Sequence, residues 1–194
     1  MPDAGFDAVV LAGGGARRLG GRDKPAAPVG GRSLLARVAD AVADARTLVV
    51  VGPPRPDVPN ARAVREDPPG AGPVPALRTG LAALTSPAPT LALLAADLPF
   101  LDATHVDALR AAARAGSGAV LVDENGREQW LAGHWSTEAL SEALGTYEGA
   151  SLHGLLSPLN PVKLKLEPGP RAPWFDCDTP EELAEANALL NQNR

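Results

Sequence analysis

A glycine-rich loop near the start of the chain is surrounded by cationic side chains. Gly13, Gly14 and Gly15 follow a short apolar run, and the next ten residues include Arg17, Arg18, Arg22 and Lys24. Because glycine has no Cβ, a ligand can closely approach the backbone N–H groups of such a loop. Backbone amides combined with cations are the chemistry of a phosphate site. The pattern therefore predicts a phosphate cradle, with backbone donors at Gly13 to Gly15 and cations at Arg18 and Lys24.

Two common phosphate-binding motifs do not fit this loop. A P-loop requires G-x-x-x-x-G-K-[ST], whereas Lys24 stands between Asp23 and Pro25. The dinucleotide motif G-x-G-x-x-G/A fails because Arg18 occupies the place of its third glycine. Pro25 also biases Lys24 away from helical geometry. The sequence thus predicts a long loop of roughly a dozen residues over its ligand, and a flexible surface loop is the alternative.

Asp97 is the second candidate for chemistry. It directly follows a strongly apolar run from Thr90 to Ala95, where an unpaired carboxylate would be costly. Such a residue is a helix cap, a paired charge or a metal ligand, and Asp102 is better placed as the cap. Magnesium binds proteins through one or two carboxylates plus substrate phosphates. Asp97 is therefore a candidate magnesium ligand, with structural charge pairing as the alternative.

Apolar patterns predict the elements that position these residues. Buried-type strands are expected at 8–12, 48–51 and 90–95, with a short strand at 61–65. A strand, crossover helix and strand in succession imply parallel pairing. Further strands at 119–122, 129–135 and 162–166 include a hairpin, and helices are expected at 33–45, 73–84, from Asp102 onward, and at 138–144, 152–156 and after Thr179. The expected fold is a three-layer α/β/α domain with a Rossmann-like, mostly parallel sheet, spanning residues 1–194 as one domain.

Three loops are expected at the same edge of this sheet. Ligands bind outside the carboxyl ends of the strands in open parallel sheets. The glycine loop, the loop from Asp67 to Pro73 and the Asp97-Leu98-Pro99 corner all follow strands. Their convergence predicts a single site.

The composition excludes several classes of protein. The chain has 194 residues, 45% of them hydrophobic, as a globular domain requires. A net charge of −5 argues against nucleic-acid or membrane-surface partners, and no run approaches a membrane span. A single cysteine, Cys177, permits no internal disulfide, and the N-terminus does not read as a signal peptide, so we expect a cytoplasmic protein.

The first motif carries a family resemblance. The stretch from Leu11 to Lys24 fits L-A-G-G-x-x-x-R-[ML]-G-G-x-D-K and resembles the molybdenum cofactor guanylyltransferase family (MobA), within the MobA-like NTP transferases. The resemblance implies a nucleotide-diphospho-sugar transferase type of fold and a magnesium ligand at Asp97. It also implies catalytic roles for Arg18, Lys24 and Asp97, and nucleotide binding by Leu11, Ala12, Gly13, Gly14, Gly15, Lys24, Asp67 and Asp97.

The chain departs from the family pattern in three places. Asp67 precedes the loop Gly72-Pro73-Val74-Pro75-Ala76, which is similar to the family's G-P-L-A-G segment. An ordinary turn aspartate is the alternative reading of Asp67. Gly52 and Pro53 replace an asparagine of the family, and its Q-P-L strand is represented by Gln129-Trp130-Leu131. Near the C-terminus, Asp176 and Asp178 replace two asparagines before Thr179. Either Asp178 or Asp176 approaches the magnesium ion opposite Asp97, or both merely charge the N-terminus of the helix.

The remaining polar residues offer no nucleophile motif. His105, His134 and His153 have no partners at metal-binding spacing, and Cys177 reads as a small buried residue. A structural or surface role is expected for each.

The resemblance implies nucleotidyl transfer from GTP to molybdopterin carrying molybdenum, with release of pyrophosphate. The product would be the guanine dinucleotide form of the cofactor, and molybdoenzymes or their chaperones would receive it. Leu-Ala-Gly-Gly favours GTP, since related cytidylyl enzymes tend to Leu-Ala-Ala-Gly. A molybdopterin cytidylyltransferase, another small-molecule nucleotidyltransferase and a non-catalytic nucleotide-binding accessory protein are the alternatives.

Overall fold

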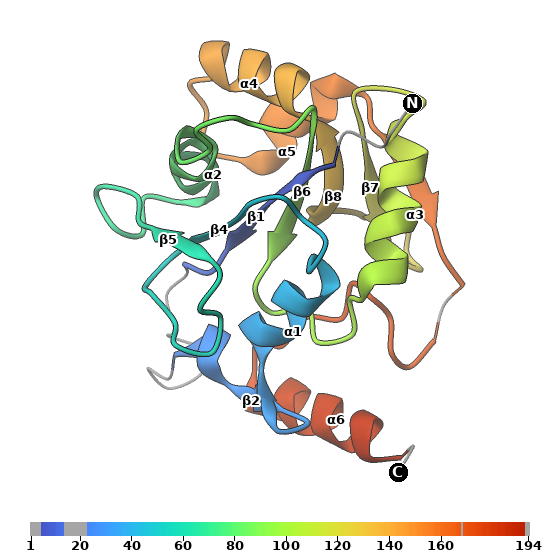
Figure 1. Ribbon diagram of the computed structural model, residues 1–194. Coiled ribbons are helices and arrows are strands. Elements are labelled where there is room, and N and C mark those ends of the chain that lie inside the picture. The colour runs from blue at the N-terminus through green and yellow to red at the C-terminus, as the bar shows by residue number, and fades with distance from the viewer. Residues whose placement is uncertain (1–4, 14–22, 168, 193–194) are drawn as a thin grey trace.

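The computed structural model describes residues 5–13, 23–167 and 169–192, and its centre is a seven-stranded sheet (Figure 1). The strand order is β5-β4-β1-β6-β8-β7-β9. The first four of these strands, β5 (Arg62–Val64), β4 (Leu48–Val51), β1 (Asp7–Leu11) and β6 (Thr90–Ala95), are mutually parallel. Strand β8 (Glu128–Ser136) runs antiparallel to β6 and to β7 (Gly118–Val122), and β9 (Val162–Lys165) lies parallel to β7. The expected mostly parallel sheet is confirmed.

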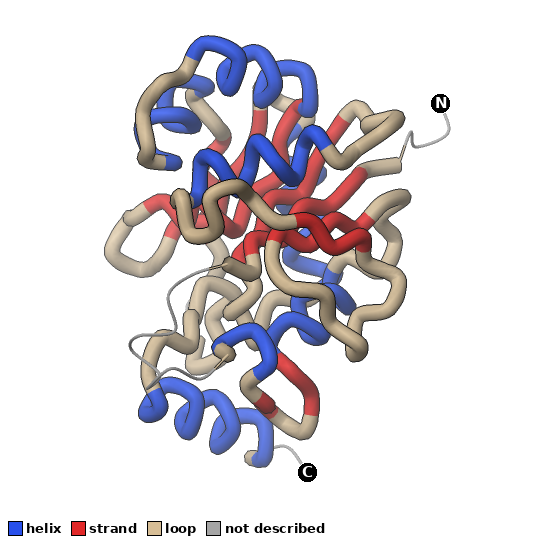
Figure 2. Tube along the Cα trace, turned by 90° about the vertical axis from the view of Figure 1, so that its left-hand side faces the viewer, coloured by secondary structure: helices blue, strands red, loops and turns tan. Residues whose placement is uncertain are grey.

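Helices cover both faces of the sheet, as the strand sequences require. Alternate residues of β1 enter different cores: Ala8 and Val10 face one cluster, and Val9 and Leu11 face the other. A strand that is buried on both sides must be apolar throughout. The first cluster is covered by α1 (Leu34–Ala41) and α3 (Ala103–Ala113), and the second by α2 (Pro73–Ala82), α4 (Thr137–Thr146) and α5 (Leu152–Leu156). The three-layer α/β/α arrangement is therefore confirmed (Figure 2).

A small third cluster lies outside the three layers. It joins the hairpin of β2 (Pro28–Val29) and β3 (Arg32–Ser33) to α6 (Pro180–Asn191). Asn187 fixes this contact, since its Oδ1 accepts from the Gly30 N–H at 2.9 Å and its Nδ2 donates to the Pro28 carbonyl at 3.3 Å. In Figure 1 the arrowhead of β6 points towards the part of the molecule that holds β2 and α6. The C-terminal helix is thereby docked below the carboxyl edge of the sheet.

Local capping signals determine where several helices begin. Ser33 caps α1 through its side chain, and Asp102 and Thr179 form capping boxes at α3 and α6. The expected extension of α1 to Ala45 is wrong, because the helix ends at Ala41. The chain turns there so that the Arg46 N–H can donate to the Phe6 carbonyl and deliver β4 to the sheet. Tertiary pairing thus overrides the helical pattern.

The short 3-10 helix η2 (Lys24–Ala26) precedes β2, and η3 (Ser157–Leu159) directly follows α5. Across the described residues, no helix has the length and apolar character needed to cross a lipid bilayer.

Candidate active site

The candidate site lies where the order of the strands reverses. From β1 the chain proceeds to β4 on one side and later to β6 on the other. Such a switch point leaves a crevice between loops that depart in opposite directions from the carboxyl edge. Gly13 leaves β1 at this point, and Asp97 follows β6.

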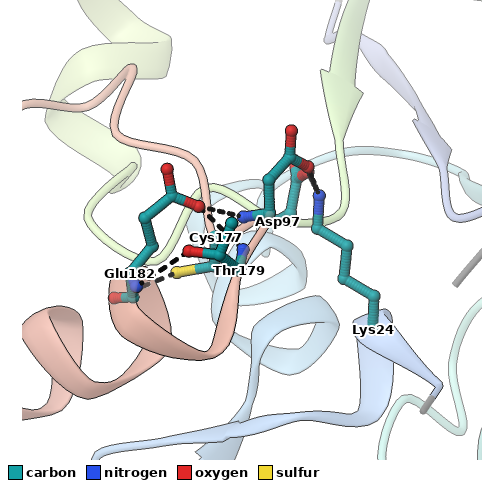
Figure 3. Close-up of polar contacts among 6 residues, drawn as sticks. Lys24, Asp97, Cys177, Thr179 and Glu182 are labelled. Carbon is teal, nitrogen blue, oxygen red and sulfur yellow. Dashed lines mark hydrogen bonds and ion pairs between the residues drawn. The ribbon is translucent and has the colours of Figure 1, made fainter. Parts of the chain in front are cut away.

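Lys24 is the centre of the polar contacts at this edge of the sheet. Its ammonium group forms ion pairs with the carboxylates of Asp97 and Asp178, which come from distant parts of the chain. Figure 3 shows the extended side chain of Lys24 reaching Asp97. The side chains of Lys24 and Asp97 are only 21% and 19% exposed, so water screens this charge cluster incompletely. The structure therefore brings together Lys24, Asp97 and Asp178, three residues that the sequence singled out.

The site carries more negative than positive charge among its described residues. Partial burial works to lower the pKa of Lys24, but Asp97 and Asp178 outweigh it and raise that pKa above its usual value. Burial and the nearby charges of Asp178 and Asp97 raise the pKa of Asp176. Lys24 therefore remains an ammonium ion beside the carboxylates of Asp97 and Asp178.

The start of α6 holds Asp178 in place. The Glu182 carboxylate accepts hydrogen bonds from the Asp178 N–H at 2.7 Å and from the Thr179 N–H at 2.8 Å (Figure 3). Thr179 Oγ1 accepts in return from the Glu182 N–H at 3.2 Å. Cys177 lies fully buried behind this turn, as expected for a structural residue, and burial raises the pKa of its thiol to about 12. The capping box is thus both a helix start and the support of an acidic site residue.

A second ion pair anchors the residue before Lys24. Both terminal nitrogens of the Arg55 guanidinium, Nη1 and Nη2, donate to the carboxylate of Asp23, and the distance from Nη2 to Oδ1 is 2.5 Å. The Arg55 side chain is 11% exposed, so the proline-rich segment after β4 provides a fixed support. Sequence reasoning missed this pair, and the only signal was an arginine among prolines.

The loop after β5 presents a different carboxylate from the expected one. Asp67 is exposed, and no hydrogen bond or ion pair joins it to the described part of the chain. Glu66, which sequence reasoning passed over, is buried, and its Oε1 accepts from the Gly70 N–H at 2.8 Å. A Cβ atom added at Gly13 would lie 3.5 Å from the same oxygen. Glu66 therefore adjoins the start of the glycine loop.

The other sequence candidates are placed as follows. Leu11 and Ala12 are buried at the end of β1, and Gly13 is exposed beyond them. Arg18, Gly14 and Gly15 lie outside the described residues. Among the histidines, His105 completes the cap of α3, His134 is buried in β8, and His153 stacks edge-on against Trp130 with ring centroids 5.6 Å apart.

The residues present fit a divalent cation that is bound mainly through substrate. Among residues 5–13, 23–167 and 169–192, no cluster of three or more His, Cys, Asp or Glu side chains forms a metal cage. Two carboxylates, Asp97 and Asp178, nevertheless converge on one cationic atom, Lys24 Nζ. Magnesium typically uses one or two carboxylates and completes its shell with water and phosphates.

A sequence comparison decides the family. A model of the MobA-like NTP transferase domain matches residues 8–162, which include the whole sheet except Asp7 at the start of β1 and the last three residues of β9. The chain belongs to the MobA-like NTP transferase family. It is therefore a nucleotidyltransferase, and the resemblance noted in the first motif is confirmed.

Relatives within the MobA-like NTP transferases agree with this assignment. A molybdenum cofactor guanylyltransferase of Bradyrhizobium sp. is 33% identical, with 93% of this chain and 91% of that protein covered. Among solved structures, molybdopterin-guanine dinucleotide biosynthesis protein A from Archaeoglobus fulgidus superposes with a TM-score of 0.75 at 18% identity, covering 96% of this chain and 100% of that one. The 2-C-methyl-D-erythritol 4-phosphate cytidylyltransferase from Thermus thermophilus gives 0.72 at 22% identity, covering 96% and 99%. The fold alone therefore does not select the nucleotide base.

Proposed function

We propose that this protein is a molybdenum cofactor guanylyltransferase, which transfers GMP from GTP to molybdopterin carrying molybdenum. The observation that carries the proposal is the Lys24 ammonium held between Asp97 and Asp178 at the switch point of the sheet. The name of the 33% identical relative supports the choice of acceptor and product.

The proposed reaction needs positioning more than proton transfer. An oxygen of the acceptor's terminal phosphate attacks the α-phosphorus of GTP, the bond from that phosphorus to the bridging oxygen breaks, and pyrophosphate leaves. Because the phosphate is already ionised at neutral pH, no strong general base is required. Catalysis is then a matter of alignment and of charge neutralisation on the α-phosphate and the leaving group.

Each role falls to a residue of the glycine loop or of the site below it. Arg18 and Lys24 bind phosphates, Gly13 to Gly15 donate backbone N–H groups, and Leu11 and Ala12 belong to the same nucleotide-binding segment. Asp97 holds the divalent metal with Asp178 as its second carboxylate, and Asp67 binds the nucleotide from the loop after β5. Mg²⁺ at this place would neutralise phosphate charge and orient the α-phosphate.

Two further proposals accompany this function. We propose that residues 1–194 form a single nucleotidyltransferase domain. We also propose that the protein is cytoplasmic, because a lone cysteine permits no internal disulfide. GTP and molybdenum-loaded molybdopterin are the proposed partners, with molybdoenzymes or their chaperones as recipients of the product.

Pyrophosphate release measured with GTP, CTP, ATP and UTP, with and without molybdopterin, tests the function directly. We expect release with GTP only when both molybdopterin and Mg²⁺ are present. Release with CTP instead of GTP would make the protein a cytidylyltransferase, and nucleotide binding without any release would identify an accessory protein.

A carboxylate variant tests the metal role separately. Asp97→Asn should abolish metal-dependent release while preserving the thermal unfolding temperature within a few degrees, because the amide keeps the size but loses the charge. Asp44→Asn, an exposed aspartate after α1, serves as the matched control and should retain full activity. Full activity in Asp97→Asn would refute the assignment.

A further inference from the structure

Glu66 is the one buried acid at the carboxyl edge of the sheet within the described residues. The only other buried acid among them, Asp7, begins β1 at the opposite edge and accepts from the Ala88 N–H at 2.6 Å. Glu66 follows β5 and is 6% exposed. A carboxylate this far from water needs partners, since burying an unpaired charge is costly.

The partners of Glu66 are incomplete. Its Oε1 accepts from the Gly70 N–H, and no other hydrogen bond or ion pair of this carboxylate is made within the described part of the chain. An ionised carboxylate offers about four lone-pair sites, so most of its accepting capacity is open. No lysine or arginine neutralises it among those residues. The group is therefore prepared to accept hydrogen bonds from a ligand.

The position of Glu66 relative to Gly13 shows where such a ligand would lie. The carboxylate lies within 4.0 Å of the place that a Cβ atom of Gly13 would take. Strands β4 and β1 separate β5 from β6, so the end of β5 lies about 14 Å from the end of β6 at the usual spacing of about 4.8 Å between strands, and the Glu66 side chain reaches back from there to Gly13. A nucleoside triphosphate with its phosphates at Lys24 extends over a comparable distance. Its base can therefore reach Glu66 past Gly13.

We propose that Glu66 selects guanine in this site by accepting hydrogen bonds from the N1–H and the 2-amino group of the base. The inference rests on the proposed function and specifies the residue that chooses the nucleotide. Guanine is the base that offers two adjacent donors on this edge, and a carboxylate offers two matching acceptors. Adenine and cytosine would present an unprotonated ring nitrogen to the carboxylate, and this lone-pair repulsion rejects them.

Inosine triphosphate provides the test, because it lacks only the 2-amino group of GTP. In the wild-type protein, GTP should bind about 10- to 100-fold more tightly than inosine triphosphate, the value of one hydrogen bond to a charged group. In Glu66→Ala this ratio should fall to near one. If Glu66 only supports the turn at Gly70, Glu66→Ala should weaken the binding of both nucleotides equally and leave the ratio of their affinities unchanged. That result would overturn the proposal.

Glu66→Gln gives a second, gain-of-function readout. The glutamine Oε1 can still accept from the Gly70 N–H, whereas its Nε2 donates to the 2-carbonyl of xanthosine triphosphate. We expect this variant to lose about 100-fold in GTP affinity and to prefer xanthosine triphosphate. Glu138→Gln, an exposed glutamate at the start of α4, is the matched control and should bind all nucleotides like the wild type.

The outcomes separate the two proposals. Wild-type preference for GTP with an unchanged GTP-to-inosine ratio in Glu66→Ala refutes the role of Glu66 and leaves the function standing. A wild-type preference for CTP refutes the proposed function itself. Isothermal titration with each triphosphate in the presence of Mg²⁺ measures these affinities.

Discussion

Replacing Lys24 with methionine should destabilise the protein and at the same time create a better site for a divalent metal. Methionine keeps an unbranched, flexible side chain but removes the charge that Asp97 and Asp178 share. The two carboxylates would then lose the ammonium group that both of them contact. Both the loss of stability and the gain in metal affinity follow from this one contact.

The size of the loss can be bounded from the exposure of the partners. Two unit charges 4 Å apart interact by about 4 kcal/mol at an effective dielectric constant of 20, whereas exposed pairs contribute only about 0–1 kcal/mol. The side chains of Lys24, Asp97 and Asp178 are 21%, 19% and 35% exposed, so the site lies between these limits. Allowing for solvent screening, we expect a loss of about 2 kcal/mol, or about 4–8 °C in Tm for a chain of 194 residues.

Thermal unfolding with and without Mn²⁺ is the assay. A metal at 100 times its Kd adds about 2.7 kcal/mol to the stability of the folded state. Mn²⁺ should raise the Tm of Lys24→Met more than that of the wild type, in which the ammonium competes for the same oxygens. In the double variant Lys24→Met, Asp97→Asn the metal effect should be small.

Lys163→Met is the matched control, because Lys163 pairs with Glu128 at an exposed position and is itself 58% exposed. Its cost should stay below about 1 kcal/mol, with no change in response to Mn²⁺. The reasoning is refuted if Lys24→Met unfolds like the wild type and responds to Mn²⁺ no more strongly.

Three further predictions concern the support of the site. Arg55→Met removes the anchor of Asp23 and should raise the KM for GTP with a stability cost of about 1 kcal/mol; an unchanged KM would separate this ion pair from the site. Partial burial opposes ionisation of Asp102, but hydrogen bonds from Thr104 and His105 outweigh it and lower its pKa, so Asp102→Ala should cost about 1 kcal/mol at pH 7. Because a lowered pKa stabilises the folded state only while the carboxylate is ionised, the difference in denaturant stability should shrink as pH falls below about 4, and a gap that widened there would contradict this account. Burial, and after it the charge of Asp97, raises the pKa of the Cys177 thiol to about 12, so Ellman's reagent at pH 8 should detect no thiol in the native protein and one after denaturation.

Local signals in the sequence were sufficient for much of the fold. The strands at 48–51 and 90–95 coincide with β4 and β6, and the caps Ser33, Asp102 and Thr179 all begin helices. Apolar runs and capping residues act through neighbours in the chain, so they can be read without the tertiary structure. The end of α1 was misjudged because a distant backbone contact, from Arg46 to Phe6, determines it.

The site, too, was predictable only where local sequence signals identify its residues. The motif and the strand edge identified Lys24 and Asp97, but 154 residues separate Lys24 from Asp178. Only the docking of α6 on the β2–β3 hairpin brings that carboxylate to the ammonium. The burial of Glu66 rather than Asp67 depends on the loop after β5, which turns back so that the Gly70 N–H donates to the Glu66 carboxylate.

The ion pairs of Lys24 also bear on substrate binding. A lysine ammonium has three donors and no acceptor, and two of its interactions are already with Asp97 and Asp178. If Lys24 binds phosphates as proposed, the ammonium is shared between the phosphates and the carboxylates, and it then balances the charge of Asp97 less fully. A divalent metal bound with the triphosphate would supply positive charge to Asp97. Metal and nucleotide should therefore bind cooperatively, with each raising the affinity for the other by the same factor. Titration of Mn²⁺ at fixed GTP, and of GTP at fixed Mn²⁺, measures both factors, and independent binding of the two would contradict this sharing of charge.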